Sequence, residues 1–143
     1  MTTDPFLLQS ITHGDARGRL SVITGMKDLP FAFARLFWIH DVEVGTIRGA
    51  HSHRAQHQAI ICMAGEIEVL IDDGANERIL RLNRLDQVLH LPPLVWSHQI
   101  VTVAGTVYAV LASGAYDVKD YLDTKAEWRQ ARREAGLDPL LPS

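Results

Sequence analysis

The sequence predicts an all-β fold, a single jelly-roll barrel followed by one C-terminal α-helix. Short segments rich in apolar and β-branched residues recur along residues 6–112, about nine of them, with turn residues at intervals of roughly eight to twelve. Such spacing is typical of sandwiches and barrels, and a jelly roll is one way of protecting their sheet edges. From residue 117 onward the pattern changes to a helical one.

The chain has 143 residues, which suits one domain with the barrel in residues 1–116 and the helix in residues 117–136. A formal net charge of -3 provides no basic field that would recruit nucleic acid or a membrane. No apolar run approaches the roughly 18 residues that cross a bilayer, and residues 1–5 do not resemble a signal peptide. Because the single cysteine, Cys62, excludes an intrachain disulfide, we expect a cytoplasmic protein.

The N-terminal part of the chain supplies expected strands at residues 6–11, 19–24 and 34–39, which are apolar or alternating. The first two flank a predicted turn at residues 13–18, where glycine and aspartate supply backbone freedom. A second turn is expected at residues 41–46. The strand that follows it carries two histidines.

The C-terminal part continues with strands and turns up to residue 112. Asp73-Gly74 is a strong hairpin signal. The expected strands cover residues 66–72, 77–82, 88–91, 96–103 and 106–112. The helix predicted for residues 117–136 ends at Gly136, and we interpret its lysines and arginines as a solvated face.

Two histidines, His51 and His53, mark the stretch where we expect a functional site. Side chains alternate along a strand, so these two point to the same face, with Arg48 before them and Arg54 after them. The run Gln58–Gly65 is mostly apolar and predicts a buried strand that enters a turn. Imidazoles and guanidiniums on one face indicate a polar pocket, because such groups are costly to bury without a purpose. The alternative is a hairpin with two surface histidines.

The spacing of this stretch resembles the motifs of the cupin family, which implies a cupin jelly-roll barrel. The matching residues are Gly45, His51, His53, Gln58 and Gly65 for the first motif, and Pro93 and His98 for the second. In metal-binding cupins the ligands are both first-motif histidines, the acidic residue of that motif and the second-motif histidine. Here His57 or Gln58 occupies the acidic position. Because imidazole suits Zn, Fe, Cu and Ni, a metal-dependent dioxygenase or isomerase is one alternative function.

A narrower resemblance covers the chain from Asp15 to Trp128. The chain resembles the cupin-type sugar-nucleotide 3,4-ketoisomerases, which act on dTDP-4-keto-6-deoxyglucose. The matching stretches are Asp15–Gly18, Leu29–Phe31, Arg48–Arg54, Leu70–Gly74, Pro93–Trp96, Leu111–Ser113, Tyr116–Asp117 and Asp120–Tyr121. The resemblance implies a homodimer that works without metal or redox cofactor in deoxysugar biosynthesis.

The residue types suit this chemistry. Moving a ketone from C4 to C3 requires removal of the C3 proton, an enediol, and return of a proton to C4. Histidine titrates near neutral pH and suits the base. The resemblance implies that His51 is this base and that His53 orients it or relays the proton. It also assigns Arg17 and Arg48 to the diphosphate, whose oxygens a guanidinium can hold in a bidentate manner.

Three further residues belong to the expected substrate pocket. His90 replaces a tyrosine that is frequent in the family and could act as the acid. Trp96 either stacks on the nucleotide base or fills the core. His98 stands one residue beyond the position of the family's histidine. These departures leave a second alternative, a sugar-nucleotide-binding protein without activity.

Overall fold

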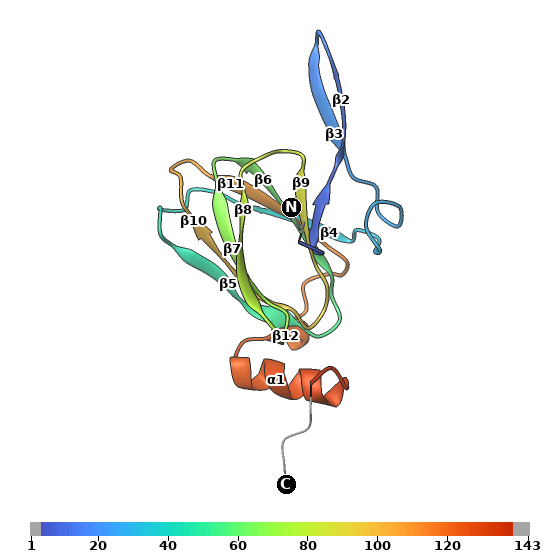
Figure 1. The fold of residues 1–143 in the computed structure, drawn as a ribbon, viewed down its shortest axis with the longest axis vertical. Coiled ribbons are helices and arrows are strands. Elements are labelled where there is room, and N and C mark those ends of the chain that lie inside the picture. Colours follow the sequence, from blue (N-terminus) through green and yellow to red (C-terminus); the bar gives the residue numbers. More distant parts are fainter. Residues whose placement is uncertain (1–3, 139–143) are drawn as a thin grey trace.

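The computed structural model of the protein describes residues 4–138. One sheet contains β1 (Leu7–Gln9), β4 (Arg35–Ile39), β6 (Gln58–Ala64), β9 (Gln87–Leu91) and β11 (Val107–Ala112). A second contains β5 (Ile47–His53), β7 (Ile67–Asp72), β8 (Glu77–Leu82), β10 (Trp96–Val101) and β12 (Tyr121–Leu122). Their strand orders are β1-β9-β6-β11-β4 and β12-β5-β10-β7-β8, and all pairs are antiparallel (Figure 1).

The main core lies between these two sheets, because alternate residues of the central strands are apolar and point inward. Its members include Ile60, Cys62, Val69, Ile71, Leu89, Val101, Tyr108 and Val110. This architecture confirms the predicted all-β jelly roll with a C-terminal helix. Within residues 4–138 the two sheets are not joined by strand pairing into a closed barrel, so the jelly roll is a sandwich.

A hairpin of β2 (Ile11–Asp15) and β3 (Gly18–Val22) rises from the sandwich (Figure 1). The turn predicted for residues 13–18 is shorter, because residues 13–15 belong to β2 and pair with β3. Every residue of the two strands is exposed. The hairpin therefore extends beyond the core of the sandwich.

The C-terminal helix α1 (Lys125–Glu134) is shorter than the range 117–136 that the sequence predicts. Residues 118–120 form a 3₁₀ turn, and Tyr121–Leu122 form β12, which pairs with the end of β5. The hydroxyl of Thr124 starts the helix by accepting a hydrogen bond from the backbone N–H of its third residue. No helix within the described range is long and apolar enough to cross a membrane.

One face of α1 packs against the second sheet. Trp128 is fully buried, and its ring lies 5.9 Å from that of Trp96. Arg132, predicted to lie on a solvated face, is only 8% exposed. It donates to the carbonyl of Leu94 at 2.9 Å and forms an ion pair with Asp138 at 2.9 Å. The basic residues of α1 are therefore not all solvated, because Arg132 packs against the rest of the fold.

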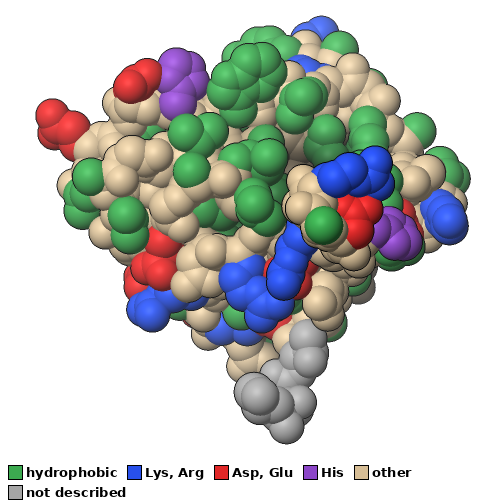
Figure 2. Space-filling model, turned by 90° about the horizontal axis from the view of Figure 1, so that it is seen from above, with side chains coloured by type: hydrophobic (Ala, Val, Ile, Leu, Met, Phe, Trp, Pro, Cys, Tyr) green, Lys and Arg blue, Asp and Glu red, His purple; other side chains and the backbone are tan. Residues whose placement is uncertain are grey.

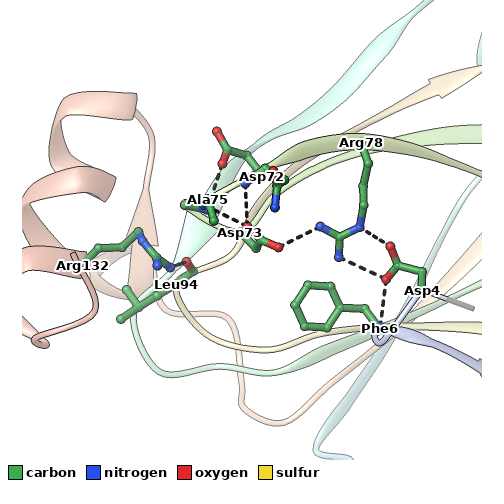
Figure 3. Close-up of polar contacts among 10 residues, drawn as sticks. Asp4, Phe6, Asp72, Asp73, Ala75, Arg78, Leu94 and Arg132 are labelled. Atoms are coloured by element: carbon green, nitrogen blue, oxygen red, sulfur yellow. Dashed lines mark hydrogen bonds and ion pairs between the residues drawn. The ribbon is translucent and has the colours of Figure 1, made fainter. Parts of the chain in front are cut away.

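The Asp72–Gly74 turn between β7 and β8 joins three parts of the fold (Figure 3). Asp73 accepts a hydrogen bond from Nη1 of Arg78 at 2.9 Å, and Arg78 also contacts Asp4 near the N-terminus. The glycine has φ +95°, and a Cβ there would lie 2.4 Å from Nη2 of Arg132. Glycine is needed at this position for both reasons, and these contacts give the Asp-Asp-Gly motif a structural role.

Candidate active site

The middle of β5 presents polar side chains to the interior of the sandwich. His51 lies opposite Ser97 and Arg48 lies opposite Gln99, so β5 holds one residue more than β10 between these pairs. This bulge brings Arg48 to the face of His51 although three positions separate them. Gly49 occupies the bulge with φ +70°, and a Cβ there would lie 2.5 Å from Oε1 of Gln99. The glycine of the Arg-Gly-x-His-x-His motif thus shapes the site.

His53 is held by a buried carboxylate. Its Nδ1 lies 2.9 Å from Oδ2 of Asp120, and both side chains are 8% exposed. Oδ1 of Asp120 also accepts from the backbone N–H of Ala55 at 2.8 Å. Because a carboxylate only accepts hydrogen bonds, Nδ1 of His53 carries a proton, and Nε2 of the neutral ring keeps its lone pair. Burial lowers the pKa of His53 below its usual 6.5, and the hydrogen bond to Asp120 opposes that shift.

His51 is a neutral imidazole beside this pair. Its ring centroid lies 4.9 Å from that of His53 and 4.9 Å from that of Tyr121. Burial, together with the neighbouring His53, lowers the pKa of His51 from 6.5 to about 4. At neutral pH its ring is therefore uncharged and able to accept a proton.

The first sheet contributes Arg35 to the same cluster. Arg35 and Phe37 alternate with exposed residues along β4 and lie on its inner side. Nη2 of Arg35 donates to Oε1 of Gln56 at 3.3 Å, and the guanidinium lies 5.1 Å from the ring centroid of Phe37 and 5.8 Å from that of Tyr116. Besides burial, the charge of Arg35 lowers the pKa of His53.

Three of the predicted site residues, His51, His53 and Arg48, therefore lie together on one face of β5. Arg48 also lies near Tyr108 of the first sheet, whose pKa its charge influences. Burial raises the pKa of Tyr108, and the charge of Arg48 opposes the increase. The cluster thus has buried or half-buried imidazoles and, at its edge, the exposed residue Arg48.

Three predicted substrate-binding residues lie away from this cluster. Arg17 is at the tip of the β2–β3 hairpin, where its side chain is 90% exposed and pairs with Asp15 at 2.7 Å. Trp96 and His98 point to the outer face of β10, opposite to that of the inward-facing Ser97. There Trp96 packs on Trp128 and belongs to a separate apolar cluster.

His90, a fourth predicted substrate-binding residue, forms a separate imidazole pair on the outer face of the first sheet. Its Nε2 lies 2.9 Å from Nδ1 of His57, and the ring of Phe31 lies 5.2 Å from His57 and 5.6 Å from His90. Burial lowers the pKa of both histidines. Between residues 4 and 138, no three His, Cys, Asp or Glu side chains are grouped in a way that could hold a metal ion.

Sequence reasoning missed Arg35, Asp120 and Tyr121 as site residues. Asp120 and Tyr121 stand in a stretch that carries the resemblance, but a helix was expected there, and strand pairing with β5 brings them to the histidines instead. Arg35 could have been noticed as a site residue because it is a charged residue within the otherwise apolar segment 34–39. The local sequence does not show that the sheet of Arg35 faces the sheet that carries the histidines.

A jelly-roll sandwich with paired histidines on an inner strand is the architecture of the cupin class. Comparison with known proteins narrows this class. The family described as FdtA: WxcM-like, C-terminal, matches residues 4–133. The chain belongs to this family.

Individual relatives agree with that assignment. The TDP-4-oxo-6-deoxy-alpha-D-glucose-3,4-oxoisomerase of Aneurinibacillus thermoaerophilus is 33% identical over 108 residues, which cover 76% of this chain and 78% of the relative. A variant of the QdtA 3,4-ketoisomerase from Thermoanaerobacterium thermosaccharolyticum, solved with TDP-4-keto-6-deoxyglucose, has a TM-score of 0.83 at 32% identity and 89% and 93% coverage. The WlaRB TDP-quinovose 3,4-ketoisomerase from Campylobacter jejuni has a TM-score of 0.82 at 31% identity and 87% and 95% coverage.

Proposed function

We propose that this protein is an isomerase that moves the keto group of TDP-4-keto-6-deoxyglucose from C4 to C3 in deoxysugar biosynthesis. The observation that carries the proposal is the neutral His51 beside the carboxylate-bound His53 on the inner face of β5. Relatives named for this reaction, or solved with this sugar, are similar to the chain over most of its length. The isomerisation is internally balanced, because one carbon is oxidised as its neighbour is reduced.

In the proposed mechanism His51 removes the proton from C3. The electron pair of that bond forms a C3–C4 double bond, and the former C4 carbonyl oxygen becomes the oxyanion of an enediolate. Negative charge on this intermediate favours the protonated imidazole, which compensates for the low pKa of His51 in the free protein. Return of the proton to C4, together with movement of the C3 hydroxyl proton to the C4 oxygen, completes the 3-keto product. His53 offers the lone pair of its Nε2 for such a hydroxyl proton.

Two arginines are proposed for the TDP diphosphate. Arg48 lies on the face of β5 that carries the histidines, so it can bind phosphate oxygens next to the sugar. Arg17 lies at the end of the hairpin that extends away from its own subunit (Figure 1). We therefore assign Arg17 to the site of a partner subunit in a homodimer.

An exposed apolar surface supports the proposed homodimer. A hollow of about 710 Å³ lies between the hairpin and the outer face of the first sheet. Val22, Met63 and Leu85 line it and are 38%, 49% and 55% exposed. Figure 2 looks from the hairpin end and shows hydrophobic side chains gathered over that face. A second copy would remove such a surface from water.

Incubation with TDP-4-keto-6-deoxyglucose, followed by NMR, tests the proposed function. We expect the C4 keto signal to be replaced by that of a C3 ketone. Unchanged substrate with measurable TDP binding would instead favour a binding protein. Metal analysis tests the mechanism separately, because stoichiometric Fe, Zn or Mn with chelator-sensitive turnover would favour a metal-dependent cupin. We further propose that the reaction takes place in the cytoplasm, with which the single, buried thiol of Cys62 is compatible.

A further inference from the structure

Two buried polar atoms in the histidine cluster have no hydrogen-bond partner within residues 4–138. One is Nε of Arg35 and the other is Nε2 of His53. The other nitrogen of the His53 ring is bound by Asp120, and Nη2 of Arg35 is bound by Gln56. Burial of an unpaired polar group is unfavourable, so the two atoms indicate the place of a ligand.

The position of Arg35 strengthens this argument. Its charged group lies beside the rings of Phe37 and Tyr116, and it forms no ion pair with any carboxylate in the part of the chain that the structure describes. A partly buried cation without a counter-ion lowers stability. Such an arrangement is typical of groups that meet negative charge during function.

The two atoms also differ in hydrogen-bonding type. Nε of Arg35 can only donate, whereas Nε2 of neutral His53 can only accept, because Asp120 holds the ring proton on Nδ1. An α-hydroxy ketone has the complementary groups, a carbonyl oxygen that accepts and a neighbouring hydroxyl that donates. The 4-keto sugar presents this pair at C4 and C3.

We propose that Arg35 is a catalytic residue that donates its Nε–H to the C4 carbonyl oxygen, while the C3 hydroxyl donates to Nε2 of His53. This proposal rests on the proposed ketoisomerase function. When His51 takes the C3 proton, the electron pair of that bond forms the C3–C4 double bond, and the C4 oxygen becomes an oxyanion facing Arg35. When the proton taken by His51 is returned to C4, His53 takes the C3 hydroxyl proton and passes it to the C4 oxygen, so no other reactant is consumed.

Arg35→Met and Arg35→Lys test the proposal, with Arg81→Met as the matched control. Arg81 lies on β8 with its side chain 61% exposed, and it forms surface ion pairs with Glu66 and Glu68. We expect kcat of Arg35→Met to fall about 10²–10³-fold, as for loss of one donor to a developing oxyanion. TDP affinity should change less than about twofold, and Arg35→Lys should restore part of kcat because it keeps the charge.

Thermal unfolding separates this role from a structural one. Removal of an unpaired cation should leave Tm of Arg35→Met unchanged or raised. A kcat within about threefold of wild type, a large loss of TDP affinity, or a lowered Tm that accounts for lost activity would each overturn the catalytic role. If wild-type protein binds TDP but leaves the sugar unchanged, the proposed function fails as well. If wild-type protein is active and the kcat of Arg35→Met equals that of wild type, only the proposed role of Arg35 fails.

Discussion

At the residue scale, the two interior histidines are distinguished by their partners. Asp120 fixes the tautomer of His53 through Nδ1, whereas the ring of His51 lies against the rings of His53 and Tyr121. Burial is the largest cause of the lowered pKa in both. In the proposed mechanism His51 therefore starts as a free base, and His53 is an oriented neighbour with one open lone pair.

This difference predicts the pH dependence of activity. In the proposed mechanism the neutral form of His51 is the base, and its pKa is lowered to about 4. We therefore expect activity to be retained below pH 6.5 and to be lost only as the pH falls through about 4. We expect kcat/KM, which reports the free enzyme, to stay nearly constant from about pH 8 to about pH 5. Rates measured at pH values where circular dichroism shows folded protein will check this. An acid limb centred near 6.5 would contradict the low pKa of the base.

At the element scale, the bulge in β5 brings Arg48 and His51 to one face. Gly49→Ala should disrupt it, because φ is +70° and the new Cβ would meet Oε1 of Gln99 at 2.5 Å. We expect the free energy of unfolding to fall by about 2–4 kcal/mol, from backbone strain together with the clash, and turnover to fall with it. Urea denaturation and the isomerase assay measure both quantities.

Gly105→Ala is the matched control for the bulge. Gly105 has φ +78°, yet nothing lies within 4 Å of a Cβ added there. The free energy of unfolding of Gly105→Ala should therefore fall only by the cost of backbone strain, about 1–2 kcal/mol, and its turnover should be unchanged. If Gly49→Ala is no more destabilised than Gly105→Ala and is fully active, the bulge does not shape the site.

The element scale also shows what the sequence could and could not predict. The strands at residues 58–64, 67–72 and 77–82 were predictable because their apolar pattern and the Asp73-Gly74 turn are local signals. The extent of the helix was not, because the segment Tyr121–Leu122 is extended through its pairing with the distant β5. Local composition carries no information on such a partner.

The candidate site, too, was predictable only where local sequence determines the geometry. The alternation of His51 and His53 gave their common face, which strand geometry dictates. The sequence around His90 is apolar on both sides, and β9 is buried on both faces, so the face of His90 was not predictable. Arg35 and Asp120 join the site only through tertiary contacts from other elements.

At the scale of the whole molecule, the exposed hairpin and apolar face are the basis of the proposed homodimer. If Arg17 acts in the partner's site, two inactive variants should complement each other. Arg17→Met and His51→Asn homodimers each lack one function in both sites, but a mixed dimer has one site with wild-type His51 and wild-type Arg17. We expect activity to reappear after the two proteins are unfolded together and refolded as a mixture.

Two observations would contradict this arrangement. Mixed and refolded variants that stay as inactive as the separate ones would place Arg17 in the site of its own subunit or outside any site. A monomer in sedimentation at micromolar concentration would remove the homodimer itself. Wild-type protein refolded alone supplies the control for recovery.

The central claim is that His51 is the base of a 3,4-ketoisomerase, and turnover of TDP-4-keto-6-deoxyglucose by His51→Asn tests it most directly. Asparagine keeps some hydrogen bonding but cannot take a proton near neutral pH. We predict that NMR-monitored turnover falls by about 10²–10⁴-fold, the usual contribution of a positioned general base, while TDP affinity remains that of wild type. His53→Asn should lose less if His53 only orients or relays. A His51→Asn protein that keeps most of the wild-type turnover would contradict the claim.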